Sequence, residues 1–137
     1  MKWTEAYATG VRRIDEHHQM IFQTAEDFRV ALDEAEGEKT YAVLLKFLEM
    51  YCRGHFGFEE RCMDQYHCPA AHKNAKAHVG FMEVLLGYRE RYEAGGYNAA
   101  EARALVDAVD GWLDGHICRI DVQLKDAVGE SRQGGAA

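Results

Sequence analysis

The chain of 137 residues has very little proline, with Pro69 as its single example. Glycine is more frequent, but it falls largely between periodic segments or near the C-terminus. Both residues interrupt helices, so their scarcity inside the periodic segments favours a helical protein. A chain of this length fits one domain with a real core and leaves no room for two sizeable ones.

Clustered positive charge and long apolar runs are also missing. The net charge is −7, from 16 Lys and Arg against 23 Asp and Glu, which argues against a nucleic-acid partner. No window reaches the apolar length that a membrane helix requires. The first residues, Met1–Glu5, contain no apolar segment typical of a secretion signal. We therefore expect a cytoplasmic protein that binds neither nucleic acid nor membrane.

A CxxC motif is absent as well, although the chain has four cysteines. In a reducing compartment such cysteines are most simply free thiols. We expect Cys52 and Cys118 to help fill the core, whereas Cys62 and Cys68 flank a predicted loop.

Apolar residues instead recur at intervals of three and four, which is the spacing of amphipathic helices. The predicted helices run from Ile14 to near Gly37, from Thr40 to near Tyr66, from about Pro69 to Gly95, and from Asn98 past Ile120. Short loops between them predict an all-α fold, an antiparallel up-down-up-down four-helix bundle. Residues 1–13 lack this period and should form an extended N-terminal arm. Asp15, Thr40 and Asn98 are the predicted N-caps, Asn98 in a capping box with Glu101.

Each predicted helix carries at least one His, Glu or Asp, side chains that commonly bind metals, on or near its apolar stripe. These are His18 on the first, His55 and Glu59 on the second, His78 on the third, and His116 and Asp121 on the fourth. Taken alone, the pair His55 and Glu59 could equally be a surface contact one helical turn apart. Burying six such groups without partners would cost several kcal/mol in total, at about 1 to 3 each, and a metal site removes that cost. Four imidazoles and two carboxylates suit two iron ions.

The spacing between His116 and Asp121 does not fit a regular helix. Five residues separate their directions by about 140°, so both cannot point inward. We therefore predict a local distortion such as a π-bulge.

In their order and spacing, these motifs resemble the bacterial hemerythrin family over nearly the whole chain. The elements that carry the resemblance are Trp3, Gly10-Val11, Ile14-Asp15 with His18, the block His55-Phe56-x-x-Glu59-Glu60, His78 with Phe81, and Trp112-x-x-x-His116-Ile117-x-x-x-Asp121. The resemblance implies that residues 1–128 form a hemerythrin-like domain. Its expected cofactor is two non-haem iron ions, bridged by carboxylates and an oxo or hydroxo group. Residues 129–137, which are small and polar, are expected to be a flexible tail or linker.

The resemblance also assigns roles to individual residues. It places His18 and His55 on an iron that keeps a position for O₂, and His78 and His116 with one further ligand on the other iron. Glu59 and Asp121 match the bridging carboxylates. Apolar residues matching the O₂ pocket are Ile21, Phe56, Trp112, Leu113 and Ile117, which would also serve as ordinary core.

One ligand of the family pattern is missing. The family carries a histidine four residues before the one matched by His78, and Asn74 stands there. Because an amide is a poor iron ligand, we expect a more open second iron, with direct binding by Asn74 or loss of the metal as alternatives. His72 could substitute only if the helix starts late or unwinds. His17, next to His18, should point about 100° away and be solvated or play a supporting role.

Several functions fit this centre. The first is reversible O₂ binding for storage, and the second, slightly favoured, is O₂ or redox sensing coupled to a partner protein or C-terminal output domain. The third is a di-iron peroxidase or oxidase acting on H₂O₂ or NO, with anions as further exogenous ligands. A structural zinc site or an empty bundle is the fourth.

Overall fold

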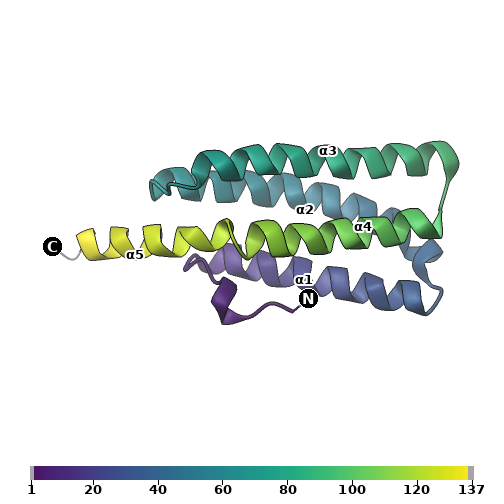
Figure 1. Cartoon of the computed structure of the whole chain (residues 1–137), viewed down its shortest axis with the longest axis horizontal. Helices are drawn as coiled ribbons and strands as arrows, with labels where there is room; N and C mark the ends of the chain where they lie inside the picture. Colours follow the sequence, from purple (N-terminus) through teal and green to yellow (C-terminus); the bar gives the residue numbers. More distant parts are fainter. Residues whose placement is uncertain (1, 136–137) are drawn as a thin grey trace.

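The computed structural model describes the backbone of residues 2–135 and the side chains of residues 2–132. It confirms the all-α prediction, with no strand in that part of the chain. In order, the elements are the 3₁₀ turn η1 (Glu5–Tyr7), α1 (Arg12–Asp33), α2 (Gly37–Gln65), α3 (Ala71–Gly95), α4 (Ala99–Trp112), the π-helical segment η2 (Leu113–Ile117), the 3₁₀ turn η3 (Asp121–Gln123) and α5 (Leu124–Gly135). Figure 1 shows α1 to α4 as an antiparallel bundle. In it α2 packs on α1 and α3, and α4 packs on α1.

The predicted apolar stripes form the core of this bundle. In α1 most buried side chains lie three or four positions apart, and α2 continues the same cluster through Leu44, Leu48 and Cys52. Leu48 is 1% exposed. Full burial of a side chain of this size stabilises the fold by roughly 1.5 to 3 kcal/mol, so the stripes account for the packing of the helices.

The start of α1 differs from the prediction. The helix begins at Arg12, and Asp15 is therefore not its N-cap. The Asp15 Oδ1 atom instead accepts hydrogen bonds from the Thr9 backbone N at 2.7 Å and from Thr9 Oγ1 at 2.9 Å. Thr9 is fully buried. The carboxylate thus fastens the N-terminal arm, which contains the turn η1 as well as extended residues.

The start of α2 also lies before the predicted cap. Just after the end of α1, Ala35 takes a φ of 59°, and Glu36 N donates to Ala31 O and Ala35 N to Leu32 O. This left-handed residue reverses the chain within three residues, so α2 begins at Gly37. Thr40 accordingly lies inside α2, where its hydroxyl donates to Glu36 O. The prediction for α4 is confirmed, because Glu101 N donates to Asn98 Oδ1 at 3.0 Å.

Gly37 is buried where two other side chains leave no room for a methyl group. A Cβ atom added there would lie 2.6 Å from Leu32 Cδ2 and 2.6 Å from the Tyr97 hydroxyl oxygen. Both atoms end side chains that can shift, so we expect Gly37→Ala to lower the free energy of unfolding by only about 1 kcal/mol through overpacking. Gly54, in the same helix, has nothing within 4 Å, so Gly54→Ala should raise it by about 0.5 to 1 kcal/mol. Urea unfolding of both variants measures the contrast, and equal signs would contradict it.

The C-terminal segment differs from the predicted flexible tail. α5 is helical as far as Gly135, and residues 136–137 lie outside the described residues. Its first turns pack into a second cluster, in which Leu124 and Val128 contact the core formed around Ile14 and Met63. Figure 1 shows α5 continuing past the end of the bundle. The docked first turns explain why the following small and polar residues stay helical.

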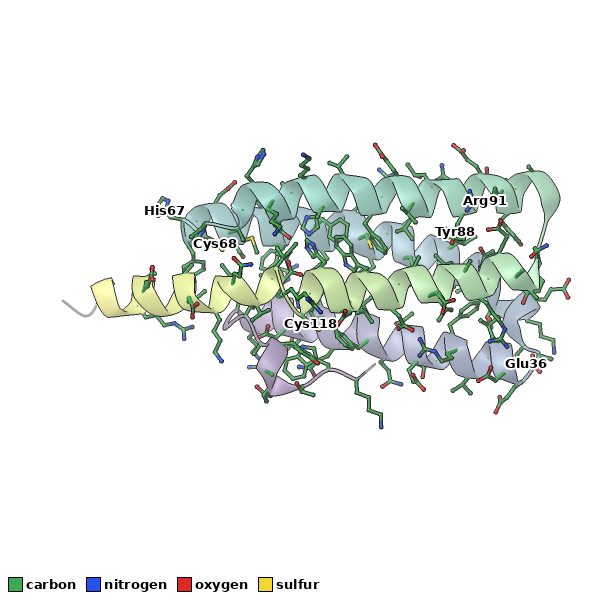
Figure 2. All side chains as sticks on the ribbon, viewed as in Figure 1. Glu36, His67, Cys68, Tyr88, Arg91 and Cys118 are labelled. Atoms are coloured by element: carbon green, nitrogen blue, oxygen red, sulfur yellow. The ribbon has the colours of Figure 1, made fainter. Side chains whose placement is uncertain are left out.

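The loop between α2 and α3 holds two residues singled out in the sequence. His67 is exposed and takes a φ of 53°, as the left-handed residue that ends α2. Cys68 is buried in the second cluster, so its thiol fills space beside Cys62 and Met63. Figure 2 shows both residues at the end of the bundle where α2 passes into α3. Within residues 2–135, no helix has the length and apolar character needed to cross a membrane.

Candidate metal centre

The six predicted ligands come together inside the bundle. They are His18 from α1, His55 and Glu59 from α2, His78 from α3, His116 from η2 and Asp121 from η3. None is more than 4% exposed. Each lies on the buried stripe of its helix or on the segment that continues it, so the packing that forms the core also brings these polar groups together.

The first group of ligand atoms joins α1 to α2. His18 Nε2 lies 3.0 Å from His55 Nε2 and 3.1 Å from Glu59 Oε2. His55 Nε2 is in turn 3.3 Å from the same carboxylate oxygen. Two imidazole nitrogens and one carboxylate oxygen therefore converge on one point, which is a donor set able to hold a metal ion.

The second group uses the other oxygen of the same glutamate. Glu59 Oε1 lies 3.2 Å from His78 Nε2, and His116 Nε2 lies 2.9 Å from Asp121 Oδ1. Asp121 Oδ2 meanwhile reaches His18 Nε2 at 3.3 Å. Glu59 and Asp121 thus each turn one oxygen toward each group, an arrangement in which a carboxylate can bridge two cations.

A π-helical turn allows His116 and Asp121 to face the same centre. Cys118 N bonds to Leu113 O at 3.0 Å, five residues back instead of four. The following turn is tightened, and Asp121 begins a 3₁₀ turn. This departure from regular α-helix confirms the distortion that the five-residue spacing predicts.

Asn74 occupies the position of the missing imidazole. Its side chain is fully buried, and its Oδ1 atom lies 2.6 Å from His116 Nε2. Its Nδ2 atom has no hydrogen-bond partner. His72 lies exposed in the first turn of α3 and is not among the clustered residues, so the structure does not bring it to the centre. The second group therefore has an amide in place of a third imidazole.

The predicted O₂-pocket residues surround the cluster with apolar surface. Ile21, Phe56, Leu113 and Ile117 are buried in the main core, and Trp112 packs against it. Two of the aromatic rings lie directly on imidazoles of the second group. Phe56 stacks on His78 at 3.8 Å between ring centroids, and Trp112 stacks on His116 at 3.9 Å. These rings restrict how the two imidazoles can turn.

Two further residues of the site were not among the predicted ligands. His17 Nδ1 lies 3.0 Å from His55 Nδ1, on the side of that ring that faces away from the cluster. The Tyr51 hydroxyl donates to the backbone carbonyl of His17. The only sequence signal for this contact is the adjacency of two histidines in one helix, which by itself does not reveal the partner.

The cluster is strongly polarised even without a cation. Burial disfavours the charged form of His18, but hydrogen bonds to Asp121 and Glu59 outweigh it and raise the pKa of His18 to about 9. Burial by itself would raise the pKa of Glu59. Hydrogen bonds from His18, His55 and His78 outweigh this effect and hold the pKa of Glu59 well below its usual range. The site-facing atoms Glu59 Oε1, His78 Nε2 and Asp121 Oδ1 lack well-formed hydrogen bonds. A bound cation would satisfy them, so the residues fit a metal.

The raised pKa of His18 predicts how the stability of the metal-free protein depends on pH. Its folded-state pKa exceeds the unfolded value of 6.5, so the protonated ring stabilises the fold fully below pH 6.5, and this contribution is lost as the pH rises through about 9. The free energy of unfolding should fall by about 2 kcal/mol between pH 6.5 and about 8.5. Chemical unfolding of the metal-free protein measures it. His18→Gln should flatten this dependence, and His67→Gln should leave it unchanged.

Comparisons of the sequence with known proteins give consistent matches over most of the chain. The model of the Hemerythrin HHE cation binding domain matches residues 9–128. A bacteriohemerythrin of Pseudomonas paraeruginosa is 31% identical over 94% of this chain and 82% of its own length. A bacteriohemerythrin of Stenotrophomonas maltophilia is 29% identical over 92% of this chain and 80% of its own. A myohemerythrin of Sipunculus nudus is 28% identical over 90% of this chain and 89% of its own.

Proposed function

Because the chain belongs to the hemerythrin family, we propose that it holds two non-haem iron ions and binds O₂. His18 and His55 would hold one ion, and His78 and His116 the other, with Glu59 and Asp121 shared between them. The observation that carries the proposal is the convergence of these buried side chains in two groups that share Glu59. When bound, ferrous ions would supply the electrons and the exchangeable coordination position that O₂ binding needs.

The residues around the ions would protect the bound gas. Phe56, Leu113 and Ile117 are each no more than 6% exposed, so they exclude water from the side of the cluster that they cover. Their apolar side chains have no proton to donate. A dry pocket of this kind favours reversible binding over release of oxidised products.

The test of O₂ binding uses anaerobic protein loaded with ferrous iron. On exposure to air we expect a visible absorption band that the metal-free protein lacks, and removal of O₂ should reverse it. The matched variant His55→Ala, which removes one ligand of the first group, should show no reversible band. An identical spectral response in both proteins would contradict the proposal.

We favour sensing over storage because one proposed ligand leads directly into α5. Asp121 is the first residue of η3, and α5 follows at Leu124 without a loop. The Arg132 side chain donates to Gly10 O at 3.4 Å, which ties α5 to the N-terminal arm. A change in the position of Asp121 would therefore be passed to α5 and to any partner protein or output domain that contacts it.

Hydrogen exchange measures this coupling. Amides of α5 should exchange at different rates in the reduced protein with and without O₂, by about threefold or more, which corresponds to a local free-energy change of roughly 0.6 kcal/mol or more. Amides of the distant half of α3 around Leu85 serve as the internal control and should not change. Unchanged exchange throughout α5 would favour storage.

The alternative is a peroxidase or oxidase that acts on H₂O₂ or NO at the second iron. Two observations favour it: the amide of Asn74 in place of an imidazole, and an apolar groove of about 330 Å³ between α3 and α4 that reaches Trp112 and His116. A small ligand could approach the second group along this groove. Turnover of H₂O₂ by the iron-loaded protein no faster than by its His78→Ala variant, which lacks a ligand of the second group, would dismiss this function.

A further inference from the structure

His17 makes a side-chain hydrogen bond to a proposed ligand from outside the cluster. Its Nδ1 atom lies 3.0 Å from His55 Nδ1, and the two rings are nearly perpendicular at 82°. His55 turns its other nitrogen, Nε2, toward His18 and Glu59. The His55 ring therefore stands between the metal centre and His17, with one nitrogen directed to each.

Packing on several sides fixes the His17 ring in this place. Tyr51 and Phe58 contact it edge-on, with ring centroids 6.0 and 6.2 Å away. The Tyr51 ring also stacks on His55 at 5.4 Å, and its hydroxyl donates to the His17 carbonyl. Three residues of α2 thus hold one residue of α1, and the contact between the two imidazoles follows from helix packing.

The other three clustered imidazoles have no comparable partner at the far nitrogen. His18 Nδ1, His78 Nδ1 and His116 Nδ1 are buried without a hydrogen bond, and His78 Nδ1 has only the Glu60 carboxylate at 3.8 Å. Among the four imidazoles, His55 alone has a hydrogen-bond partner at the nitrogen that faces away from the cluster.

Two facing nitrogens at this distance share a single proton. If His55 Nε2 binds a cation it carries no proton, so its proton lies on Nδ1 and is donated to His17 Nδ1. His17 must then be a neutral acceptor that holds its own proton on Nε2. An acceptor with no net charge orients the ring without adding a further negative charge to those of Glu59 and Asp121.

We propose that His17 is a positioning residue, which holds His55 as its Nδ1–H tautomer and aims Nε2 at the first metal ion. The metal part of this inference rests on the proposed function, whereas the tautomer part does not. Asn is the conservative replacement, because its Oδ1 atom can take the place of His17 Nδ1 as acceptor. Phe keeps a ring of similar size and removes the acceptor.

The test measures the tautomer and the metal affinity separately. Long-range ¹H–¹⁵N NMR should show His55 as the Nδ1–H tautomer in the metal-free and zinc-loaded wild-type protein and in His17→Asn, and a mixture of tautomers in metal-free His17→Phe. Zinc affinity at the first group should fall about 10- to 100-fold in His17→Phe and by less than about threefold in His17→Asn. His67→Phe is the matched control at an exposed histidine and should match wild type.

Two results would overturn the inference. One is the finding that His55 of the metal-free wild-type protein carries its proton on Nε2. This measurement uses the wild-type protein alone, so it tests the inference even if His17→Phe fails to fold. The other is an equal loss of zinc affinity in His17→Asn and His17→Phe, which would show that packing and not the acceptor matters. The zinc titration and the NMR measurement involve neither iron nor O₂. The role of His17 is therefore tested separately from O₂ binding, and a failure of one can be distinguished from a failure of the other.

Discussion

Glu59→Gln should abolish tight binding of both metal ions at once, with a loss of affinity of at least about 100-fold at each group. Glu59 gives one oxygen to the first group and the other to the second, so a single substitution removes a shared anion. The amide has nearly the same shape and cannot carry the negative charge that the cations need. Metal content after dialysis and calorimetric titration with ferrous iron under anaerobic conditions measure the effect.

The control for this variant is a second glutamate in the bundle that faces solvent. Glu83 is exposed on α3, and Glu83→Gln should bind both ions as the wild type does. Unfolding of the metal-free proteins separates a loss of ligand from a loss of fold. If Glu59→Gln kept one ion at wild-type affinity, the carboxylate would not be shared and the two groups would be independent.

Asn74→His should restore a third imidazole to the second group and lengthen the lifetime of the oxygenated protein by about tenfold or more. Asn74 is fully buried, and its Oδ1 atom is 2.6 Å from His116 Nε2, so a side chain at this position already reaches the centre. Another firmly bound nitrogen leaves less room for external anions to enter. The decay of the visible absorption band after air exposure gives the lifetime.

His72 provides the matched control for this restoration. It is exposed two residues earlier in the same helix, and His72→Ala should leave the lifetime and the metal content unchanged. Equal lifetimes in wild type and Asn74→His would mean that the missing ligand is already replaced. A shorter lifetime in His72→Ala would identify His72 as that replacement.

The bundle and the positions of the six predicted ligands follow from the sequence because both depend on helical period. His55 and Glu59 are one turn apart and face the same way by geometry alone. His116 and Asp121 are five residues apart, a spacing at which a regular α-helix cannot direct both side chains inward. This spacing predicts the π-helical turn that the structure contains.

The ends of the helices could not be predicted because their residues have more than one use. Asp15 has the composition of an N-cap, yet its carboxylate binds Thr9 in the arm, a contact six residues away that no local pattern specifies. The extension of α5 over residues 129–135 depends on Leu124 and Val128 docking against Ile14 and Met63, which only the tertiary structure provides.

The contact between His17 and His55 shows a third limit. Helical geometry correctly predicts that His17 points away from the direction of His18, but that direction is not solvent alone. The neighbouring helix α2 lies there and presents the far side of the His55 ring. A prediction made from one helix at a time misses a contact that depends on how two helices pack.

The central claim is that two iron ions share the cluster of buried histidines and carboxylates. The most direct measurement is diffraction from a crystal of the iron-loaded protein at wavelengths on either side of the iron absorption edge. The account predicts two anomalous peaks, one among His18, His55 and Glu59 and the other among Glu59, His78, His116 and Asp121. A single peak, or none at these residues after iron has been supplied, would contradict it.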